Sequence, residues 1–154
     1  MPRTVTLRIT EIFHSLQGET SRSGLPTVFV RLTGCPLRCS WCDTEYAFTG
    51  GTTRTLDEVL AEVAQHRCQT VCVTGGEPLA QKSCLALLTA LCDAGYSVSL
   101  ETSGALDIGG VDPRVSRIVD LKAPGSGEDA RNLLSNIPLL TLHDEVKLVV
   151  ASEA

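Results

Sequence analysis

The chain has 154 residues, of which 43% are hydrophobic and 20% charged, and its formal net charge is −5 at pH 7. This length corresponds to about one domain, and the composition predicts a water-soluble globular fold rather than a disordered chain. The acidic balance, without any run of like charges, disfavours non-specific binding to nucleic acids and to anionic membranes, because both require a basic surface.

Apolar periodicity predicts strands that alternate with helices along the chain. The predicted strands are 5–9, 27–33, 70–74, 98–102, 117–122 and 145–150. The predicted helices are 55–66, 78–95 and 128–137, with Pro78 suited to the first turn of the second helix and Gly95 to its C-terminal cap. This alternation favours a parallel sheet, either open and doubly wound or curved into a partial barrel, and the strand pattern does not separate the two. Without a repeat or a linker, we expect a single domain over residues 1–154.

Polar and glycine-rich segments recur directly after the predicted strands. They are TGC at 33, TGGEP at 74, ETSG at 101 and DLKAP at 120. Because the carboxyl ends of parallel strands meet at one edge of a sheet or barrel, we expect the chemistry of the protein at that edge.

The chain has seven cysteines, and its first residues, MPRTVTLRITEIFHS, do not carry the apolar core of a signal peptide. Nor is any apolar run long enough to span a bilayer. We therefore expect a cytoplasmic protein, in whose reducing surroundings clustered thiols are metal ligands more often than disulfides.

Three of the cysteines, Cys35, Cys39 and Cys42, follow a predicted strand at the spacing C-x3-C-x2-C. Structural zinc takes four protein ligands, usually as two close pairs, so this triplet is a poor half of a zinc site. Three thiolates can hold three irons of a four-iron cluster and leave the fourth iron open to a second molecule. The alternative is three buried, redox-inert thiols. The remaining cysteines, Cys68, Cys72, Cys84 and Cys92, are predicted to pack in the core.

The cysteine loop, followed downstream by TGGEP (74–78), resembles the radical S-adenosylmethionine (SAM) superfamily. In that superfamily the open iron binds the amino and carboxylate groups of the methionine moiety of SAM, and reductive cleavage gives methionine and a 5′-deoxyadenosyl radical. The two glycines of TGGEP would let the backbone approach such a ligand closely, although a tight strand-to-helix turn explains them equally well.

Two further segments, IFHSLQGETSRSGLPTVFVRLTGC (12–35) and CSWCDTEYAF (39–48), resemble the 7-carboxy-7-deazaguanine synthase family. The resemblance continues through ETSG (101–104), DLKAP (120–124) and DEVKLVV (144–150). It implies a partial (incomplete) parallel α/β barrel of about six strands. It also implies a carbon–nitrogen lyase that converts 6-carboxy-5,6,7,8-tetrahydropterin to 7-carboxy-7-deazaguanine with loss of ammonia, in the biosynthesis of queuosine and other 7-deazapurines for tRNA modification.

The resemblance also assigns site residues, with no catalytic side chain beyond the cofactor-derived radical. The iron–sulfur ligands are Cys35, Cys39 and Cys42, and the magnesium ligand is Thr44. The SAM-binding residues are Trp41, Asp43, Gly76, Glu77, Glu101, Ser103, Asp120, Leu121 and Lys122. The substrate-binding residues are Leu16, Gln17, Gly18, Glu19, Arg31 and Thr74. A planar guanidinium such as that of Arg31 suits the substrate carboxylate, and a magnesium ion accepts a single hydroxyl ligand beside substrate and water.

The implied partners are a pterin and a reducing electron donor such as flavodoxin, without direct contact with nucleic acid or membrane; a homodimer stays open. Family chains continue past the point where this sequence stops, so we expect a radical SAM domain without the usual C-terminal segment. Two alternative functions stay open: an activase that abstracts hydrogen from a partner protein, and a non-catalytic metal-binding or redox module.

Overall fold

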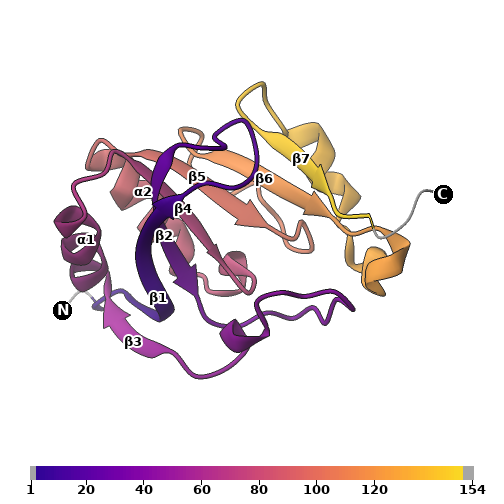
Figure 1. Ribbon diagram of the computed structural model, residues 1–154, viewed down its shortest axis with the longest axis horizontal. Helices are drawn as coiled ribbons and strands as arrows, with labels where there is room; N and C mark the ends of the chain where they lie inside the picture. The colour runs from indigo at the N-terminus through magenta and orange to yellow at the C-terminus, as the bar shows by residue number, and fades with distance from the viewer. Residues whose placement is uncertain (1–2, 151–154) are drawn as a thin grey trace.

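The computed structural model describes residues 3–150, in which seven strands form one open sheet (Figure 1). The strands are β1 (Thr6–Leu16), β2 (Pro26–Leu32), β3 (Thr52–Thr55), β4 (Thr70–Gly75), β5 (Ser97–Thr102), β6 (Ser116–Leu121) and β7 (Glu145–Leu148). Their order is β3-β1-β2-β4-β5-β6-β7; β2 and β4 to β7 are parallel, whereas β1 is antiparallel to both of its neighbours. The incomplete α/β architecture is confirmed. The last residues of the sequence, 151–154, lie outside the described part.

All six predicted strands are present, and the differences lie at the amino-terminal edge. β1 is about twice as long as predicted. The prediction ended at residue 9 because the register shifts between Ile9 and Glu11, where the alternation of apolar residues is interrupted. β3 is not among the predicted strands, since its sequence TTRT has no apolar residue, and it forms as an edge partner of β1. β1 is antiparallel because the segment 17–25 is too short for a parallel crossover.

The first predicted helix is confirmed as α1 (Leu56–Gln65), which begins with a reciprocal capping box between Thr55 and Glu58. The second is shorter than predicted. A 3₁₀ turn over Pro78–Ala80 ends at Gln81, whose backbone is extended and whose side chain bonds the Arg8 backbone, and α2 follows only over Cys84–Asp93. Gly95 follows α2 at φ +90°, as predicted for its cap.

The third predicted helix, 128–137, was wrong. The structure has two 3₁₀ segments there, Asp129–Arg131 and Leu134–Leu139. Between them the backbone of Asn132 is extended, and its side chain pairs with both backbone groups of Lys122. A side chain that binds the neighbouring backbone competes with helix formation, and local periodicity does not show it.

The core lies between the sheet and the two helices, which contribute to a single apolar cluster. Side chains alternate across each central strand: Val28, Val30 and Leu32 of β2 belong to the cluster, whereas Phe29 and Arg31 face the other side, where they line a cavity. β4 and β5 follow the same rule, so polar groups gather on the sheet face that the helices do not cover. No helix within residues 3–150 is long and apolar enough to cross a membrane.

Candidate active site

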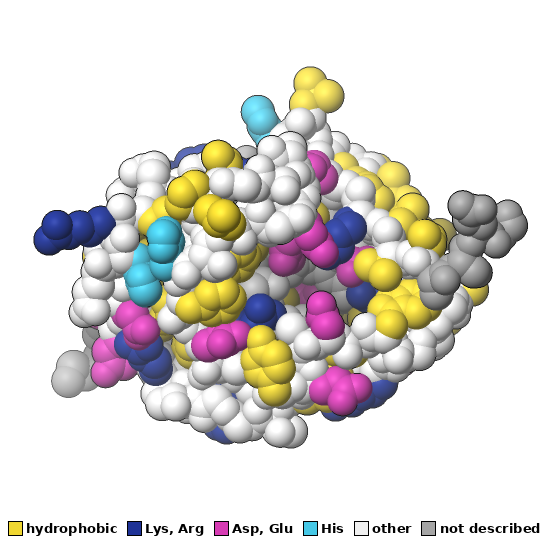
Figure 2. All heavy atoms as spheres, in the orientation of Figure 1, with side chains coloured by type: hydrophobic (Ala, Val, Ile, Leu, Met, Phe, Trp, Pro, Cys, Tyr) yellow, Lys and Arg dark blue, Asp and Glu magenta, His cyan; other side chains and the backbone are white. Residues whose placement is uncertain are grey.

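The uncovered face of the sheet is hollowed into a cavity of about 540 Å³, which Figure 2 shows as a depression with acidic and basic side chains at its walls. Its lining comes from separate segments between Phe13 and Val149, so parts of the chain that are distant in the sequence meet there. Most of the predicted site residues line it: Leu16, Gln17, Gly18, Glu19, Arg31, Cys35, Cys39, Trp41, Cys42, Asp43, Thr44, Thr74, Gly76, Glu101, Ser103, Asp120 and Lys122. Glu77 and Leu121 do not.

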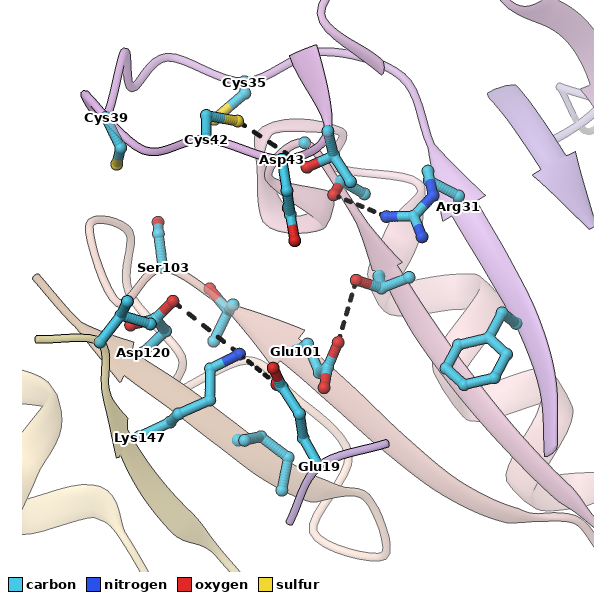
Figure 3. Close-up of a pocket in the computed structure, with 18 of the residues that line it drawn as sticks. Glu19, Arg31, Cys35, Cys39, Cys42, Asp43, Glu101, Ser103, Asp120 and Lys147 are labelled. Atoms are coloured by element: carbon cyan, nitrogen blue, oxygen red, sulfur yellow. Dashed lines mark hydrogen bonds and ion pairs between the residues drawn. The ribbon is translucent and has the colours of Figure 1, made fainter. Parts of the chain in front are cut away.

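The three clustered thiols reach the cavity from the loop after β2. All three are free and half-buried, and Figure 3 shows Cys35 beside Cys42 with Cys39 farther along the loop. Among residues 3–150, no three His, Cys, Asp or Glu side chains converge on a single metal ion. A four-iron cluster does not require such convergence, because each thiolate binds a different iron. Burial raises the pKa of the Cys35 and Cys39 thiols, so ligation must displace their protons.

The cysteine loop is anchored to its surroundings by its own backbone and by a neighbouring turn. The Arg38 guanidinium donates to the carbonyls of Cys35 and Leu37, both at 2.6 Å, and stacks on Phe48 with 4.0 Å between Cζ and the ring centroid. Ser40 bonds the carbonyl of Gly125, where a Cβ would lie only 2.8 Å from the Trp41 ring. The thiols are therefore presented by a loop that is already fixed.

The glycine-rich turn after β4 presses against this loop. A Cβ on Gly76 would lie 2.1 Å from the carbonyl oxygen of Gly34 and 3.0 Å from Cβ of Cys35, so only glycine fits. The amide of Glu77 donates to the same Gly34 carbonyl at 2.7 Å. The turn and the thiols thus form one rigid wall of the cavity.

Glu77 lies behind that wall rather than in it. It is fully buried, and its oxygens accept from Thr102 Oγ1, from the amide and hydroxyl of Ser103 and from the amide of Leu79, at 2.6–2.9 Å. In this position Glu77 joins the TGGEP turn to the end of β5, and its assignment to SAM binding stays a prediction. Leu121 packs against the apolar cluster instead of lining the cavity.

One carboxylate oxygen of Asp120, in the cavity wall, has no hydrogen-bond donor among residues 3–150. Its Oδ2 accepts from Lys122 Nζ at 2.9 Å, but its Oδ1 is buried and accepts no hydrogen bond from residues 3–150. A buried carboxylate oxygen without a donor is unfavourable, so a donor from a bound molecule would stabilise it. The hydroxyl groups of a cofactor such as SAM are donors of the kind that this oxygen would accept, and the three thiols are ligands of the kind that an iron–sulfur cluster requires.

Three of the predicted substrate-binding residues, Gln17, Gly18 and Glu19, belong to the loop 17–25. Gln17 is 6% exposed. Its backbone N–H donates to the backbone carbonyl of Leu25 at 2.9 Å, and its backbone carbonyl accepts from the N–H of Gly24 at 2.7 Å. The loop closes with Thr20 and Gly24 at positive φ. Gln17 Oε1 also accepts from the amide of Glu19 at 3.3 Å, so the segment is arranged by its own hydrogen bonds.

Arg31 is held by residues that the sequence reasoning missed. Its Nε donates to Glu11 Oε1 at 2.8 Å, and Nη1 donates to the carbonyl of Gly75 at 3.3 Å. The Tyr46 hydroxyl donates to the same Glu11 oxygen at 2.7 Å. Burial opposes the charge of Glu11, but these hydrogen bonds from Tyr46 and Arg31 outweigh it and lower its pKa. Glu11 comes from the extended part of β1, so local patterning gave no signal for it.

Lys147, on β7, is a second residue that was missed. Its ammonium donates to Glu19 Oε2 at 2.7 Å and lies 4.0 Å from Asp120 Oδ2 (Figure 3). Burial opposes its charge, but the bond to Glu19 and the nearby carboxylates of Glu101 and Asp120 raise its pKa. Burial also raises the pKa of Glu101. The available signal was a lysine between Val146 and Leu148 in an apolar strand.

Comparison with known proteins agrees with this geometry. A family model described as "Radical SAM superfamily" matches residues 29–124. The 7-carboxy-7-deazaguanine synthase of Koribacter versatilis is 46% identical over 150 residues, which cover 96% of this chain and 66% of the relative. The enzyme of that name from Chlorobaculum tepidum is 48% identical over 157 residues, covering 100% of this chain and 71% of the relative. The chain belongs to the 7-carboxy-7-deazaguanine synthase family of the radical SAM superfamily.

A solved structure agrees on the fold. "Crystal structure of QueE from Escherichia coli" matches with a TM-score of 0.70 and 25% identity over 93% of this chain and 83% of that chain. The chain spans 66% and 71% of the lengths of the two curated synthases named above. A [4Fe–4S] cluster and SAM are the cofactors of the superfamily, and the thiol loop and the wall of the cavity fit them.

Proposed function

We propose that the chain performs the reaction named for its relatives, in which 6-carboxy-5,6,7,8-tetrahydropterin is converted to 7-carboxy-7-deazaguanine with loss of ammonia. This step belongs to the biosynthesis of queuosine and other 7-deazapurines. The observation that carries the proposal is that three thiols, a glycine-only turn and a polar loop converge on one cavity although they are distant in the sequence. Cys35, Cys39 and Cys42 would hold the cluster, which when bound would supply one electron to break a carbon–sulfur bond of SAM and so give methionine and a hydrogen-abstracting radical.

The walls of the cavity suit a flat, polar heterocycle. Phe13 and Phe29 line it with stacked rings, 5.1 Å between centroids at 14°, and offer an apolar face. Gln17 and Glu19 bring amide and carboxylate groups that can pair with the amide and amidine edge of a pterin. Arg31 and Thr74 lie on the adjacent strands, where we propose that the guanidinium binds the pterin carboxylate. An activase would need an opening for a protein segment, and the ordered 17–25 loop at this end favours a small molecule instead.

We further propose that Thr44 is a magnesium ligand. Its hydroxyl lies at the cavity wall, 3.8 Å from Cys42 Sγ, and magnesium needs few protein oxygens when substrate and water complete its shell. We expect two partners, the pterin substrate and a low-potential reductant such as flavodoxin. We also propose that the protein works in a reducing cytoplasm and that it is a single domain.

Anaerobic reconstitution tests the proposal directly. The protein should bind iron and sulfide, its spectrum should change on addition of SAM, and with carboxytetrahydropterin and a reductant it should release 7-carboxy-7-deazaguanine and ammonia. A sample that assembles the cluster and cleaves SAM but leaves the pterin unchanged would refute the substrate assignment. A sample that binds iron without a response to SAM would favour the metal-binding alternative.

A further inference from the structure

The loop 17–25 is fastened to β7, which lies more than one hundred residues away in the sequence. The amide and hydroxyl of Ser21 donate to the two oxygens of Glu145 at 2.9 and 2.8 Å. Two residues along the same strand, Lys147 Nζ donates to Glu19 Oε2 at 2.7 Å. Side chains two residues apart on a strand lie on the same face, so Glu145 and Lys147 both contact the loop from one side.

The charges around Lys147 explain why it engages Glu19 rather than Asp120. Asp120 is its register partner on β6, but the Asp120 carboxylate already pairs with Lys122, and its Oδ2 is 4.0 Å from Lys147 Nζ. Figure 3 shows the Lys147 side chain directed between Asp120 and Glu19. Lys147 binds Oε2 of Glu19, and the other oxygen of Glu19, Oε1, accepts no hydrogen bond from the described residues.

We propose that Lys147 is a positioning residue, which fixes the Glu19 carboxylate so that its other oxygen accepts hydrogen bonds from the amide or amidine N–H groups of the heterocyclic substrate. Glu145 fixes the far end of the same loop through Ser21. The substrate part of this inference rests on the proposed function, whereas the attachment of the loop to β7 does not. Positioning lowers the entropic cost of binding, because the acceptor need not be ordered when the substrate arrives.

The first test measures the loop without any ligand. In Lys147→Met, hydrogen exchange of the amides 18–25 and tryptic cleavage after Arg22 should rise about three- to tenfold, the range expected for loss of a partly exposed ion pair. Lys147→Arg should restore most of the protection, because it retains the charge. Glu145→Gln should mainly affect amides near Ser21. Lys82→Met, at an exposed lysine outside the cavity, serves as the matched control and should change neither readout. Unchanged exchange in Lys147→Met would overturn the proposal.

The second test uses the cluster-loaded enzyme. Lys147→Met should raise KM for the pterin about three- to tenfold and leave kcat and the SAM affinity within about twofold. In a double-mutant cycle, Lys147→Met should add little to Glu19→Ala, because without the Glu19 carboxylate Lys147 has no acceptor to position. Additive effects, or a penalty confined to the carboxylated pterin and absent with its decarboxylated analogue, would show that Lys147 touches the substrate itself and would overturn the positioning role. A pterin that is never turned over, with loop exchange still raised in Lys147→Met, would refute the proposed function and leave the attachment to β7 standing.

Discussion

At the scale of single residues, the orientation of Arg31 in the cavity is set by neighbours that are distant in the sequence. Arg31 lies on β2, but its orientation depends on Glu11 of β1 and on Tyr46, which follows the cysteine loop. Arg31 Cζ lies 5.6 Å from the centroid of the Tyr46 ring and 6.0 Å from that of Phe13. Such a residue is pre-oriented for a planar anion, since its rotamer is decided before the ligand arrives.

Substitution of Arg31 tests this orientation. Arg31→Ala should lower kcat/KM for the carboxylated pterin about thirty- to two-hundredfold, the equivalent of about 2–3 kcal/mol for a charge-assisted pair at a desolvated site. Arg31→Lys should recover little of the lost kcat/KM, because an ammonium group cannot reproduce the two parallel hydrogen bonds that a planar guanidinium makes to a carboxylate. Glu11→Gln should cost about fivefold or less, since it only loosens the guanidinium.

The control for this series is Arg54→Ala, because Arg54 pairs with Glu62 on α1 and does not line the cavity. It should leave kcat/KM unchanged. Loss of iron in Arg31→Ala, or an equal penalty on the decarboxylated analogue, would contradict a role in binding the carboxylate.

The cysteines divide into two groups by their surroundings. Cys39→Ala should abolish assembly of the cluster and cleavage of SAM, as measured by iron content and by methionine release, because within residues 3–150 no thiol besides Cys35, Cys39 and Cys42 lines the cavity and could replace it. Cys84 is fully buried in the apolar cluster, and burial raises its pKa to about 12. Cys84→Ala should therefore retain the cluster and lower only stability. The opposite pattern would overturn the assignment of ligands.

At the scale of elements, the site depends on two turns that are in close contact and on one edge strand whose apolar side chains are exposed. The TGGEP turn touches the cysteine loop at the Gly34 carbonyl. β7 lies at the edge of the sheet, where Val146 and Leu148 are exposed, and it pairs with β6 in parallel register. Both elements bring residues into the cavity, so their attachment decides its geometry.

Gly76→Ala tests the contact between the two turns. The added Cβ would meet backbone, which cannot move aside as a flexible side chain can, so the cysteine loop must shift. We expect loss of cluster assembly, read as iron and sulfide content, together with a lower melting temperature. Gly18→Ala is the matched control, because nothing lies within 4 Å of its Cβ position. Gly76→Ala protein with a full complement of iron would contradict the close contact.

The pair of Arg117 on β6 and Asp144 before β7 should hold that edge of the sheet. Their side chains are 10% and 1% exposed, with 2.7 Å between Nη2 and Oδ2. Breaking such a buried pair costs about 3–5 kcal/mol, so Asp144→Asn should lower the free energy of unfolding at neutral pH by roughly that amount.

The same pair predicts a pH dependence. Burial acts to raise the pKa of Asp144, but the bonds from Arg117 prevail and lower it. A carboxyl with a lowered folded-state pKa stabilises above its unfolded pKa, about 3.9, and loses that contribution as the pH falls through the folded value. The free energies of unfolding of wild type and Asp144→Asn, measured with denaturant, should therefore differ by a constant amount near neutral pH and converge below about pH 4. A difference that is unchanged in acid would exclude the ionised pair as its source.

At the scale of the whole molecule, the cavity joins segments from the first strand to the last, so a ligand that fills it should stabilise the entire fold. SAM at about one hundred times its dissociation constant should add about 2.7 kcal/mol to the free energy of unfolding of cluster-loaded protein. Cluster-free Cys39→Ala protein should gain much less, because the methionine end would find no open iron. Equal thermal shifts in both proteins would show that SAM binds without the cluster.

The sequence by itself determined the six main strands, the first helix and the identity of the cofactor-binding motifs. These features are local: apolar alternation, the Thr55–Glu58 capping box and the C-x3-C-x2-C spacing are each complete within a few residues. The sequence also indicated most of the cavity lining, because the polar segments that follow parallel strands must meet at one edge.

The tertiary structure alone decided what depends on contacts between distant segments. β3 has no apolar pattern and exists only because β1 offers it an edge. The helix expected at 128–137 is lost because Asn132 binds the backbone of Lys122. Glu77 lies behind the cavity wall because the end of β5 supplies donors for its buried side chain. Glu11 reaches Arg31, and Lys147 reaches Glu19, because strands from opposite ends of the chain lie beside these two residues. The hydrogen-bond partner of a buried or half-buried charge is set by which segments become neighbours in space, and no local pattern encodes that choice.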